Sequence, residues 1–415
     1  MSIRLLAPAL LWVSLAPAAE PALPEVAPAD WPWWRGPTLD GKSRDQTAPT
    51  RWSATENVVW KVPVPGRGHS SPVLWGDRVF LTTADEAKQT QRVLAFDRKT
   101  GRALSDTVAH TGGLDPKHEK NSHASATPAC DGERVYAVFV NGGALHVTAT
   151  DLDGKVVWQT KAGPYTSQHG NGSSPVLYKK TVIVVADSMK GSFLAALDRT
   201  TGEAVWKIDR PVTGRNGSYE SPVVAMIAGK PQLIVQGTRV TTSYDPDTGK
   251  VLWTCDGPAE VTGCTPAFDD KNVFATGGFP EREILAIRAD GSGDVTKTHI
   301  AWRTKKGVTY VPSPLYHAGR LYVVNDQGMA TCFDVKRGRE VWSERLGGAF
   351  TSSLVLAGDL IYATNEEGKT YVFKASDKFE QVAVNDVGEG VLATPAAAGG
   401  RIYLRTAGSL YCIGQ

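Results

Sequence analysis

The sequence predicts an all-β protein folded as an eight-bladed β-propeller. A Ser-Pro or Thr-Pro pair, or a close variant, opens a short apolar segment eight times, at intervals of 40 to 56 residues. Most of these repeats end with a turn containing Gly and then a tryptophan. No segment beyond the first 18 residues has a convincing helical period. Repeats of this length, built from strands and turns, are typical of propeller blades. The openings are Ser71-Pro72, Thr127-Pro128, Ser174-Pro175, Ser221-Pro222, Thr265-Pro266, Ser313-Pro314, the degenerate Ser352-Ser353, and Thr394-Pro395.

Each repeat divides into four expected strands, and the third repeat shows the division most clearly. Its strands are expected at residues 174–178, 181–187, 192–198 and 203–207. These runs are rich in Val, Ile, Leu and Ala and are separated by Asp and Gly turns, which favours strand over helix. Proline is tolerated at the first residue of an edge strand, and the innermost strand of a blade has such an edge at the central channel.

Tryptophans mark the expected outer strands of six blades. A wide indole on one blade needs a flat surface on the next, and glycine with its peptide plane supplies one. We therefore expect contacts between blades, rather than a single central core, to hold the ring together. Leu104 occupies the expected tryptophan position in blade one, and Phe379 is expected to replace tryptophan in blade seven. The docking residues are Trp60, Trp158, Trp206, Trp253, Trp302 and Trp342.

The eighth repeat, residues 394–414, supplies only three strands. The segment at residues 56–64, which carries Trp60, precedes blade one and is expected to provide the missing outer strand. Closure of the ring by this strand removes exposed sheet edges. The count is therefore eight blades, with seven as the alternative, and the propeller is expected to span residues 52–415.

The first 18 residues are expected to be a signal peptide, followed by an N-terminal extension over residues 19–51. Arg4 precedes an apolar run, and small residues end it at Ala16-Pro17-Ala18. The run is too short to span a bilayer. Localisation in the periplasm or secretion from the cell is the expected outcome, without a transmembrane segment. The net charge of +2 and the interspersed acids and bases give no reason to expect nucleic acid as a partner.

Five cysteines leave at least one unpaired in a monomer. Cys255 and Cys264 flank a connection between blades and form the only plausible disulfide. None of the five is placed at metal-binding spacing, so no metal site is expected. The first cysteine, Cys130, lies far beyond the leader, so a lipid anchor at the cleavage site is not expected.

The repeats themselves resemble a known family. The segments DLDGKVVW (151–158), DRTTGEAVW (198–206), DPDTGKVLW (245–253) and DVKRGREVW (334–342) are similar to the tryptophan-docking repeat of pyrroloquinoline quinone (PQQ) repeat propellers. The resemblance extends over nearly the whole chain. It implies two branches: quinoprotein dehydrogenases, which bind PQQ and Ca²⁺ over the propeller centre, and non-enzymatic propellers such as the scaffold lipoprotein of outer-membrane β-barrel assembly.

Several features of the sequence help to decide between the dehydrogenase branch and the scaffold branch. The chain lacks the adjacent cysteines on which many quinoprotein alcohol dehydrogenases stack the cofactor, and no compact Glu, Asn and Asp set matches their calcium ligands. The segment from Trp31 to Gly36 is similar to the N-terminal segment of those enzymes, and the segments 31–37 and 293–303 are also similar to secreted bacterial PQQ-repeat propellers. We therefore expect a binding or assembly scaffold of the cell envelope without a cofactor. A PQQ-dependent oxidoreductase acting on an alcohol or sugar, with Ca²⁺, is the alternative.

A ligand site is expected on one face, over blades one to four. The connections into the first strand and between the second and third strands share this face, and long ordered loops tend to carry function. The connection from Ser105 to Ser122 is the longest of them and includes His110. His69, His123 and His169 precede three successive openings and are expected to approach one another. Simple bonding of imidazoles to loop carbonyls is the structural alternative, and no catalytic residue is assigned. The expected binding residues, for a protein partner or a small polar or sugar-like ligand, are Arg67, His69, His118, Asn121, His123, His169, Asn171, Arg215, Asn216, Tyr219 and Glu220.

Overall fold

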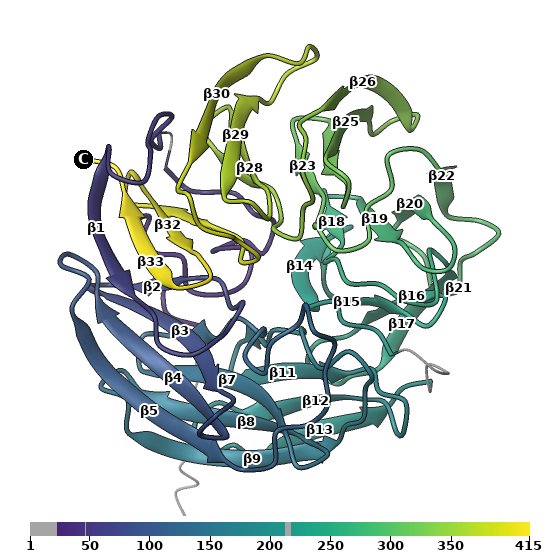
Figure 1. Ribbon diagram of the computed structural model, residues 1–415. Helices are drawn as coiled ribbons and strands as arrows, with labels where there is room; N and C mark the ends of the chain where they lie inside the picture. Colours follow the sequence, from purple (N-terminus) through teal and green to yellow (C-terminus); the bar gives the residue numbers. More distant parts are fainter. Residues whose placement is uncertain (1–22, 46, 212–216) are drawn as a thin grey trace, which may run out of the picture.

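The computed structural model describes residues 23–45, 47–211 and 217–415, so the expected signal peptide, Arg215 and Asn216 lie outside the described residues. Eight antiparallel sheets form a closed ring around a central channel, as Figure 1 shows. Seven sheets have four strands, and the sheet of blade four has a fifth. The prediction of an all-β, eight-bladed propeller is confirmed. Among the described residues, no helix is long and apolar enough to cross a membrane.

The strands follow the chain from the channel outwards in each blade. Blade one holds β2 (Val73–Trp75), β3 (Arg78–Asp85), β4 (Thr90–Asp97) and β5 (Ala103–Thr111). Blade two holds β6 (Ala129–Cys130), β7 (Arg134–Asn141), β8 (Ala144–Asp151) and β9 (Val156–Pro164). Blade three holds β10 (Val176–Tyr178), β11 (Thr181–Ala186), β12 (Phe193–Asp198) and β13 (Ala204–Asp209). Blade four holds β14 (Val223–Ile227), β15 (Lys230–Gly237), β16 (Val240–Tyr244) and β17 (Val251–Asp256), with β21 (Gly293–Asp294) at its outer edge.

The second half of the ring repeats this order with shorter strands. Blade five holds β18 (Ala267–Phe268), β19 (Asn272–Gly277), β20 (Glu283–Arg288) and β22 (Ile300–Thr304). Blade six holds β23 (Leu315–His317), β24 (Arg320–Val324), β25 (Met329–Asp334) and β26 (Arg339–Arg345). Blade seven holds β27 (Val355–Ala357), β28 (Leu360–Thr364), β29 (Lys369–Lys374) and β30 (Gln381–Asp386). Blade eight holds β31 (Ala396–Ala398), β32 (Arg401–Arg405) and β33 (Ser409–Ile413), and β1 (Val58–Pro63) completes it.

The N-terminal strand closes the ring as predicted. β1 pairs antiparallel with β33, with Trp60 opposite Cys412, and the two strands lie side by side in purple and yellow in Figure 1. Trp60 then packs on the turn of blade one, where its indole N–H donates to the carbonyl of Arg98 at 3.1 Å. Closure leaves no free strand edge at the junction between the first and last blades.

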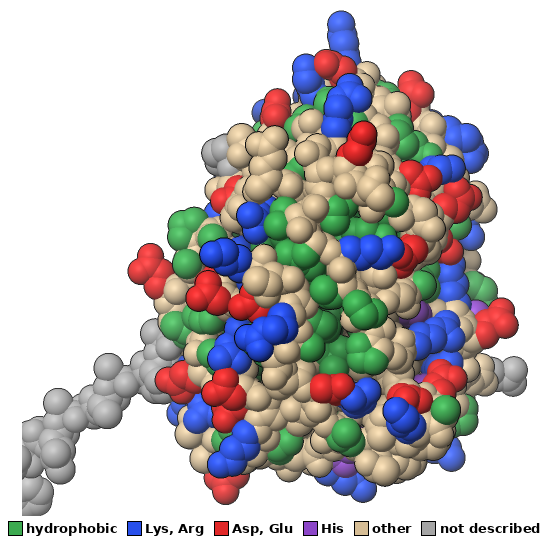
Figure 2. Space-filling model, turned by 60° about the vertical axis from the view of Figure 1, so that its left-hand side comes forward, with side chains coloured by type: hydrophobic (Ala, Val, Ile, Leu, Met, Phe, Trp, Pro, Cys, Tyr) green, Lys and Arg blue, Asp and Glu red, His purple; other side chains and the backbone are tan. Residues whose placement is uncertain are grey.

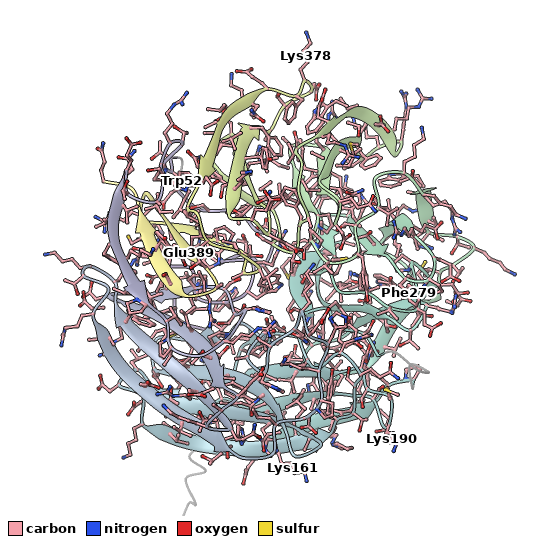
Figure 3. All side chains as sticks on the ribbon, viewed as in Figure 1. Trp52, Lys161, Lys190, Phe279, Lys378 and Glu389 are labelled. Atoms are coloured by element: carbon pink, nitrogen blue, oxygen red, sulfur yellow. The ribbon has the colours of Figure 1, made fainter. Side chains whose placement is uncertain are left out.

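Tryptophan docking joins successive blades. Each docked indole N–H donates to a backbone carbonyl of the next blade, and most of the rings lie flat against a glycine of that turn. The donor and acceptor pairs are Trp60 with Arg98, Trp158 with Arg199, Trp206 with Pro246, Trp302 with Val335, and Trp342 with Ser376. The apolar core is therefore distributed between neighbouring blades, and Figure 3 shows side chains filling these spaces around the ring.

Trp253 differs from this pattern. It is fully buried, and its indole N–H donates to Oε1 of Gln232 in its own blade at 2.8 Å. The cause is the segment at residues 290–299, which forms β21 and pairs in parallel with β17 at Trp253. This segment takes the place of the glycine turn against which Trp253 was expected to dock.

The structure also corrects the residues assigned to the docking position in blades one and seven. In blade one, Ser105 rather than Leu104 stands opposite Ala95, at the register of the docking tryptophans, and it contacts Gly154 of blade two. In blade seven this register holds Ala383. Phe379 instead packs against Trp342 of blade six, with ring centroids 5.3 Å apart. A one-residue bulge precedes the tryptophan register in each of these strands, which the spacing of the sequence alone does not reveal.

The N-terminal extension crosses one end of the channel rather than lying outside the ring. Trp31 forms a bridge with Leu74 of blade one, and the Pro32 carbonyl accepts from the backbone of Cys130 in blade two. Farther along, Lys42 pairs with Leu356 of blade seven. The segment between these contacts closes the channel at this end.

All five cysteines are buried and free, so Cys255 and Cys264, the one pair that the sequence left open, form no disulfide. Acidic and basic side chains are interspersed on the surface seen in Figure 2, with no large area of one sign.

Candidate functional site

A cavity of about 700 Å³ occupies the channel at the end opposite the N-terminal segment. Trp34 lines it from below, and its indole N–H donates to the Thr265 hydroxyl at 2.8 Å. The walls come from the connections into the first strands and the loops between second and third strands, which share this face as predicted. The lining residues used below are Trp34, His69, His118, Lys120, Asn121, Ser125, Gln168, His169, Tyr219, Val261, Phe279, Tyr310, Val311 and Asp326.

The hydroxyl groups of the blade openings form the inner wall of the channel. At six of the openings a backbone N–H donates to the hydroxyl oxygen at the next opening, at 2.9 or 3.0 Å. These bonds explain why serine or threonine opens the repeats: the side chain satisfies a buried N–H of the preceding blade. The donor and acceptor pairs are Ser71 with Thr127, Thr127 with Ser174, Ser174 with Ser221, Thr265 with Ser313, Ser313 with Ser353, and Ser353 with Thr394.

Imidazoles and a phenol line one side of the cavity. The rings of His118 and His169 lie 5.5 Å apart in an edge arrangement, and His169 lies 5.8 Å from the ring of Tyr219. Asn121 fixes this wall, since its Nδ2 donates to the carbonyl of His169 at 2.6 Å and its Oδ1 accepts from the Ser125 hydroxyl at 2.6 Å. His118 and Asn121 come from the connection into blade two, His169 from the connection into blade three, and Tyr219 from the connection into blade four.

His69 completes this side from blade one. Burial lowers its pKa to about 3, and the neighbouring cations Arg405 and Arg67 lower it further. Burial also lowers the pKa of His169. These imidazoles are therefore neutral at physiological pH and offer hydrogen bonds rather than charge.

The opposite wall is largely apolar. Val261, Phe279, Tyr310 and Val311 line it, and Phe279 is half exposed at the rim. Asp326 is the carboxylate on this wall, and its two oxygens accept the backbone N–H groups of Tyr310 and Val311 at 2.8 and 3.1 Å. Burial raises the pKa of Asp326. The cavity therefore offers one polar side and one aromatic and aliphatic side.

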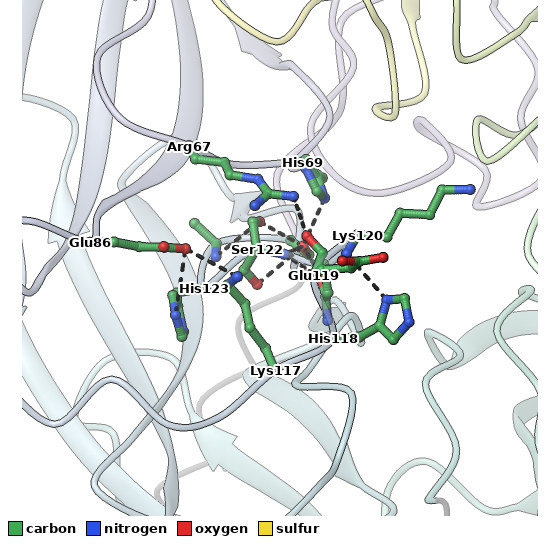
Figure 4. Close-up of polar contacts among 12 residues, drawn as sticks. Arg67, His69, Glu86, Lys117, His118, Glu119, Lys120, Ser122 and His123 are labelled. Carbon is green, nitrogen blue, oxygen red and sulfur yellow. Dashed lines mark hydrogen bonds and ion pairs between the residues drawn. The ribbon is translucent and has the colours of Figure 1, made fainter.

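Some of the predicted site residues meet in this cavity, and others do not. His69, His118, Asn121, His169 and Tyr219 line it. His123 lies on the other side of the 117–123 segment, directed at Glu86, with its Nε2 3.8 Å from the carboxylate (Figure 4). The expected convergence of His69, His123 and His169 is therefore wrong, and His118 takes the place of His123.

Three other predicted residues have structural contacts outside the cavity. Arg67 donates to the carbonyl of Glu119 at 2.6 Å. Asn171 accepts from the backbone N–H of Ser173. His110 belongs to β5, because this strand continues to Thr111, and its ring packs 4.8 Å from that of His146. The first connection is thus shorter than the sequence indicated.

Glu220 is buried behind the cavity wall, 1% exposed, and Thr262 is the hydrogen-bond partner of its Oε2 at 3.2 Å. Within the described part of the chain, its Oε1 has no hydrogen-bond partner. Burial, followed by repulsion from Asp187, raises the pKa of Glu220 to about 8. Asp187 itself is paired with Arg210, at 2.7 Å from Nε to Oδ1.

Several lining residues were not predicted from the sequence. Trp34 belongs to a motif that was weighed only as a resemblance to the dehydrogenases, and the opening hydroxyls belong to a motif that was used only to predict the fold. Lys120 and Gln168 adjoin predicted residues, whereas Phe279 and Asp326 lie in loops of blades five and six that carried no recognisable pattern. Each blade of a propeller places its opening residue at the channel. The positions of the openings in the repeat therefore already indicate that their serine and threonine hydroxyls line the channel.

The side chains that line the cavity do not form the calcium site that the dehydrogenase branch of the family implies. Among the described residues, no three His, Cys, Asp or Glu side chains are grouped to hold a metal ion. The carboxylate that lines the cavity, Asp326, already accepts two backbone N–H groups. Calcium requires six to eight oxygen ligands. The donor set therefore does not match that cation.

The docked tryptophans, the hydroxyl-lined channel and its closure by an N-terminal strand define an eight-bladed propeller of the PQQ-repeat class. A family model, PQQ_2, described as "Outer membrane protein assembly factor BamB", matches residues 47–104, 107–232 and 331–413. The matched segments make up more than half of the chain, which therefore belongs to this family.

Two curated relatives extend the comparison. The chain is 24% identical to "Outer membrane protein assembly factor BamB" of Yersinia pestis over 388 residues, covering 89% of this chain and 90% of the relative. It is 25% identical over 348 residues to "Tetrathionate hydrolase" of Acidithiobacillus ferrooxidans, covering 75% of this chain and 65% of the relative. The chain thus spans slightly less than two thirds of the hydrolase.

Solved structures share the fold at low sequence identity. BamB from Moraxella catarrhalis has a TM-score of 0.62 and 14% identity, covering 86% of this chain and 99% of its own. Quinohemoprotein alcohol dehydrogenase from Comamonas testosteroni has a TM-score of 0.64 and 13% identity, covering 93% of this chain and 81% of its own. Both the scaffold and the dehydrogenase branches thus share this architecture.

Proposed function

We propose that this protein is an exported, non-catalytic binding propeller of the cell envelope, whose channel mouth holds a small organic ligand or a short segment of a protein partner. The observation that carries the proposal is the cavity of about 700 Å³ above Trp34, polar on one side and apolar on the other. A cavity of this size, closed at one end and lined by aromatic side chains with a few polar groups, is typical of a ligand site.

Two further features support binding rather than catalysis. The imidazoles of His69 and His169 have lowered pKa values, which makes them poor proton donors at neutral pH. The relatives named as assembly factors support a scaffold role in the envelope, as does the apolar leader expected over residues 1–18.

The binding proposal can be tested with N-phenyl-1-naphthylamine, a neutral aromatic probe whose fluorescence rises in apolar sites. We expect saturable binding to the purified protein and a loss of affinity of about tenfold in Trp34→Ala, because the floor of the cavity is lost. Val205→Ala, which changes an exposed side chain on an outer strand, is the matched control and should bind normally. Absence of saturable binding, or equal affinity in the two variants, would contradict the proposal.

A PQQ-dependent oxidoreductase is the second candidate, favoured by the structural similarity to quinohemoprotein alcohol dehydrogenase over 93% of the chain. The mismatch of the donor set argues against it. We expect no reduction of an artificial electron acceptor when the protein is incubated with PQQ, Ca²⁺ and a panel of alcohols and aldoses. Sustained turnover above a heat-inactivated control would favour the oxidoreductase.

The similarity to the relative named tetrathionate hydrolase suggests one more assay, for the hydrolysis of tetrathionate. Tetrathionate should remain unconsumed in the presence of the purified protein, measured against the same heat-inactivated control. Its consumption would replace the binding proposal with a hydrolytic one.

A further inference from the structure

The buried arginines of this protein fall into two groups. Arg199 and Arg210 lie between blades and are paired with carboxylates, Arg199 with Asp131 and Arg210 with Asp187. Arg35 and Arg405 lie beside the channel, are 3% and 2% exposed, and form no ion pair among the described residues. Because an unpaired buried cation is costly, buried cations in proteins are usually paired with an anionic group.

Arg405 lies directly behind the polar wall of the cavity. Its Nη1 donates to the hydroxyl of Ser70 at 2.7 Å and to the carbonyl of Thr82 at 2.7 Å. Ser70 adjoins His69, which lines the cavity. These partners are neutral, and burial without a compensating carboxylate lowers the pKa of Arg405 to about 9. The positive charge of Arg405 is therefore not neutralised within the described residues.

Arg35 is placed similarly beneath the cavity, next to Trp34. Its guanidinium donates to the carbonyls of Leu354 and Pro314 at 3.0 and 2.7 Å. These carbonyls directly follow Ser353 and Ser313, whose hydroxyls belong to the channel wall. The carboxylate of Asp40 attracts Arg35 but forms its ion pair with Lys42, at 2.9 Å.

Lys120 adds a cation inside the cavity. Its Nζ lies 2.6 Å from Oε1 of Glu366 at the rim. Asp326 is the acidic group of the lining, on the apolar side, where it is occupied by backbone N–H groups. Figure 4 shows His69, His118 and Lys120 on the same side of the 117–123 segment. Lys120 is therefore the cation of the described lining, and the buried guanidinium of Arg405, which no carboxylate pairs, lies behind the same polar wall.

We propose that the cavity selects an anionic organic ligand, with its carboxylate or sulfonate group beside Lys120 and His69 and its apolar body against Phe279 and Tyr310. This inference rests on the proposed binding function and specifies the class of ligand. An acid group in this position would lie in the combined field of Lys120, Arg405 and Arg35, in surroundings of low dielectric where such interactions are strong. Neutral imidazoles beside it would add hydrogen bonds.

The test compares two probes that differ by one group. 8-Anilinonaphthalene-1-sulfonate is N-phenyl-1-naphthylamine with an added sulfonate. We expect the sulfonate probe to bind at least about fivefold more tightly at low salt, and this preference to shrink at high salt because the charges are partly screened.

Charge variants locate the anion. Lys120→Gln should weaken binding of the sulfonate probe about fivefold and leave the neutral probe within about twofold. Glu366→Gln should tighten binding of the sulfonate probe, because Lys120 is then released from its partner. Lys117→Gln is the matched control, since Lys117 pairs with Glu86 outside the cavity lining.

The outcomes separate this inference from the function on which it rests. If the neutral probe binds as tightly as the sulfonate or more tightly, the anion preference is overturned while a binding function stands. If the sulfonate probe binds tightly but neither Lys120→Gln nor Glu366→Gln changes its affinity, the proposed position is overturned. If neither probe binds, both proposals fail.

Discussion

The indole N–H of Trp34 donates to the hydroxyl of Thr265 at 2.8 Å, and this single bond joins the N-terminal segment to the channel wall of blade five. Trp34 is separated from Thr265 by 231 positions in the chain. The same indole forms the floor of the cavity. One side chain from outside the repeats therefore contributes both to the closure of the channel and to the shape of the candidate site.

A first prediction follows for Thr265. Thr265→Val keeps the volume of the side chain but removes the acceptor for the Trp34 indole. We expect it to lower the free energy of unfolding by about 1 to 3 kcal/mol, because a part-buried donor loses its partner. Thr248→Val, at an exposed turn, is the control. Urea denaturation followed by tryptophan fluorescence measures both, and equal midpoints would contradict the role assigned to Thr265.

The hydroxyl groups of the openings provide a second prediction. In Ser221→Ala, the buried N–H of Ser174 loses the oxygen that lies 2.9 Å away, and the expected destabilisation is about 1 to 3 kcal/mol. Ser173 is the matched control, because it is equally buried and its hydroxyl has no hydrogen-bond partner among residues 23–45, 47–211 and 217–415. Ser173→Ala should therefore change the unfolding midpoint little. A larger effect of Ser173→Ala than of Ser221→Ala would show that the hydroxyl bonds do not stabilise the channel wall.

The docking surface for Trp60 can be tested through two glycines with left-handed backbone. Gly101 has φ 76° and Gly76 has φ 54°. A methyl group at Gly101 would lie 2.8 Å from the Trp60 ring, whereas one at Gly76 would meet nothing within 4 Å. Both alanine variants carry backbone strain of about 1 to 2 kcal/mol, and Gly101→Ala should cost about 2 kcal/mol more through overpacking. Calorimetry should reveal this difference, and similar melting temperatures would contradict docking at Gly101.

Glu220 makes stability depend on pH. Its folded-state pKa is raised from 4.5 to about 8, so the folded protein keeps a proton that the unfolded chain has released within this range. The free energy of unfolding contributed by this group should therefore fall as pH rises above about 4.5 and reach its minimum above about 8. Glu220→Gln should remove this slope and raise stability at pH 8 by at least about 1 kcal/mol.

Unfolding measured at several pH values tests this prediction. The exposed Glu203→Gln serves as the control and should retain the slope of the original protein. A Glu220→Gln variant that is as pH-sensitive as the original protein would mean that Glu220 is ionised in the folded state.

The sequence predicted the ring because the ring is repetitive. Spacing of Ser-Pro openings, turns and tryptophans recurs along the chain, so the blade count and the closure by Trp60 could be inferred without knowledge of packing. Local departures from the repeat could not be inferred in this way, because they depend on packing. Leu104 was misassigned because a bulge shifts the register by one residue to Ser105, and Trp253 because an inserted segment occupies its docking surface. Phe379 was misassigned because the docking register in blade seven holds a small residue, Ala383, while Phe379 packs on Trp342.

The candidate site was harder to predict for a physical reason. A channel cavity gathers one or two residues from each blade, and their neighbours in space are distant in sequence. His69 and His169 were found because loops before openings point to the channel. His123 was wrongly included because the direction of a side chain on an irregular segment is not fixed by its offset from a proline.

The pairing of β1 with β33 also sets the order in which the molecule can be completed. The ribosome makes Val58 long before Ile413, so the first strand waits through the synthesis of the intervening repeats before it finds its partner. During that interval the edge of β1 and the indole of Trp60 are available to other chains or to chaperones. A chain broken off within blade eight cannot complete the circle, and its exposed edge distinguishes it from the finished protein. The topology thus couples the appearance of the native surface to full-length translation.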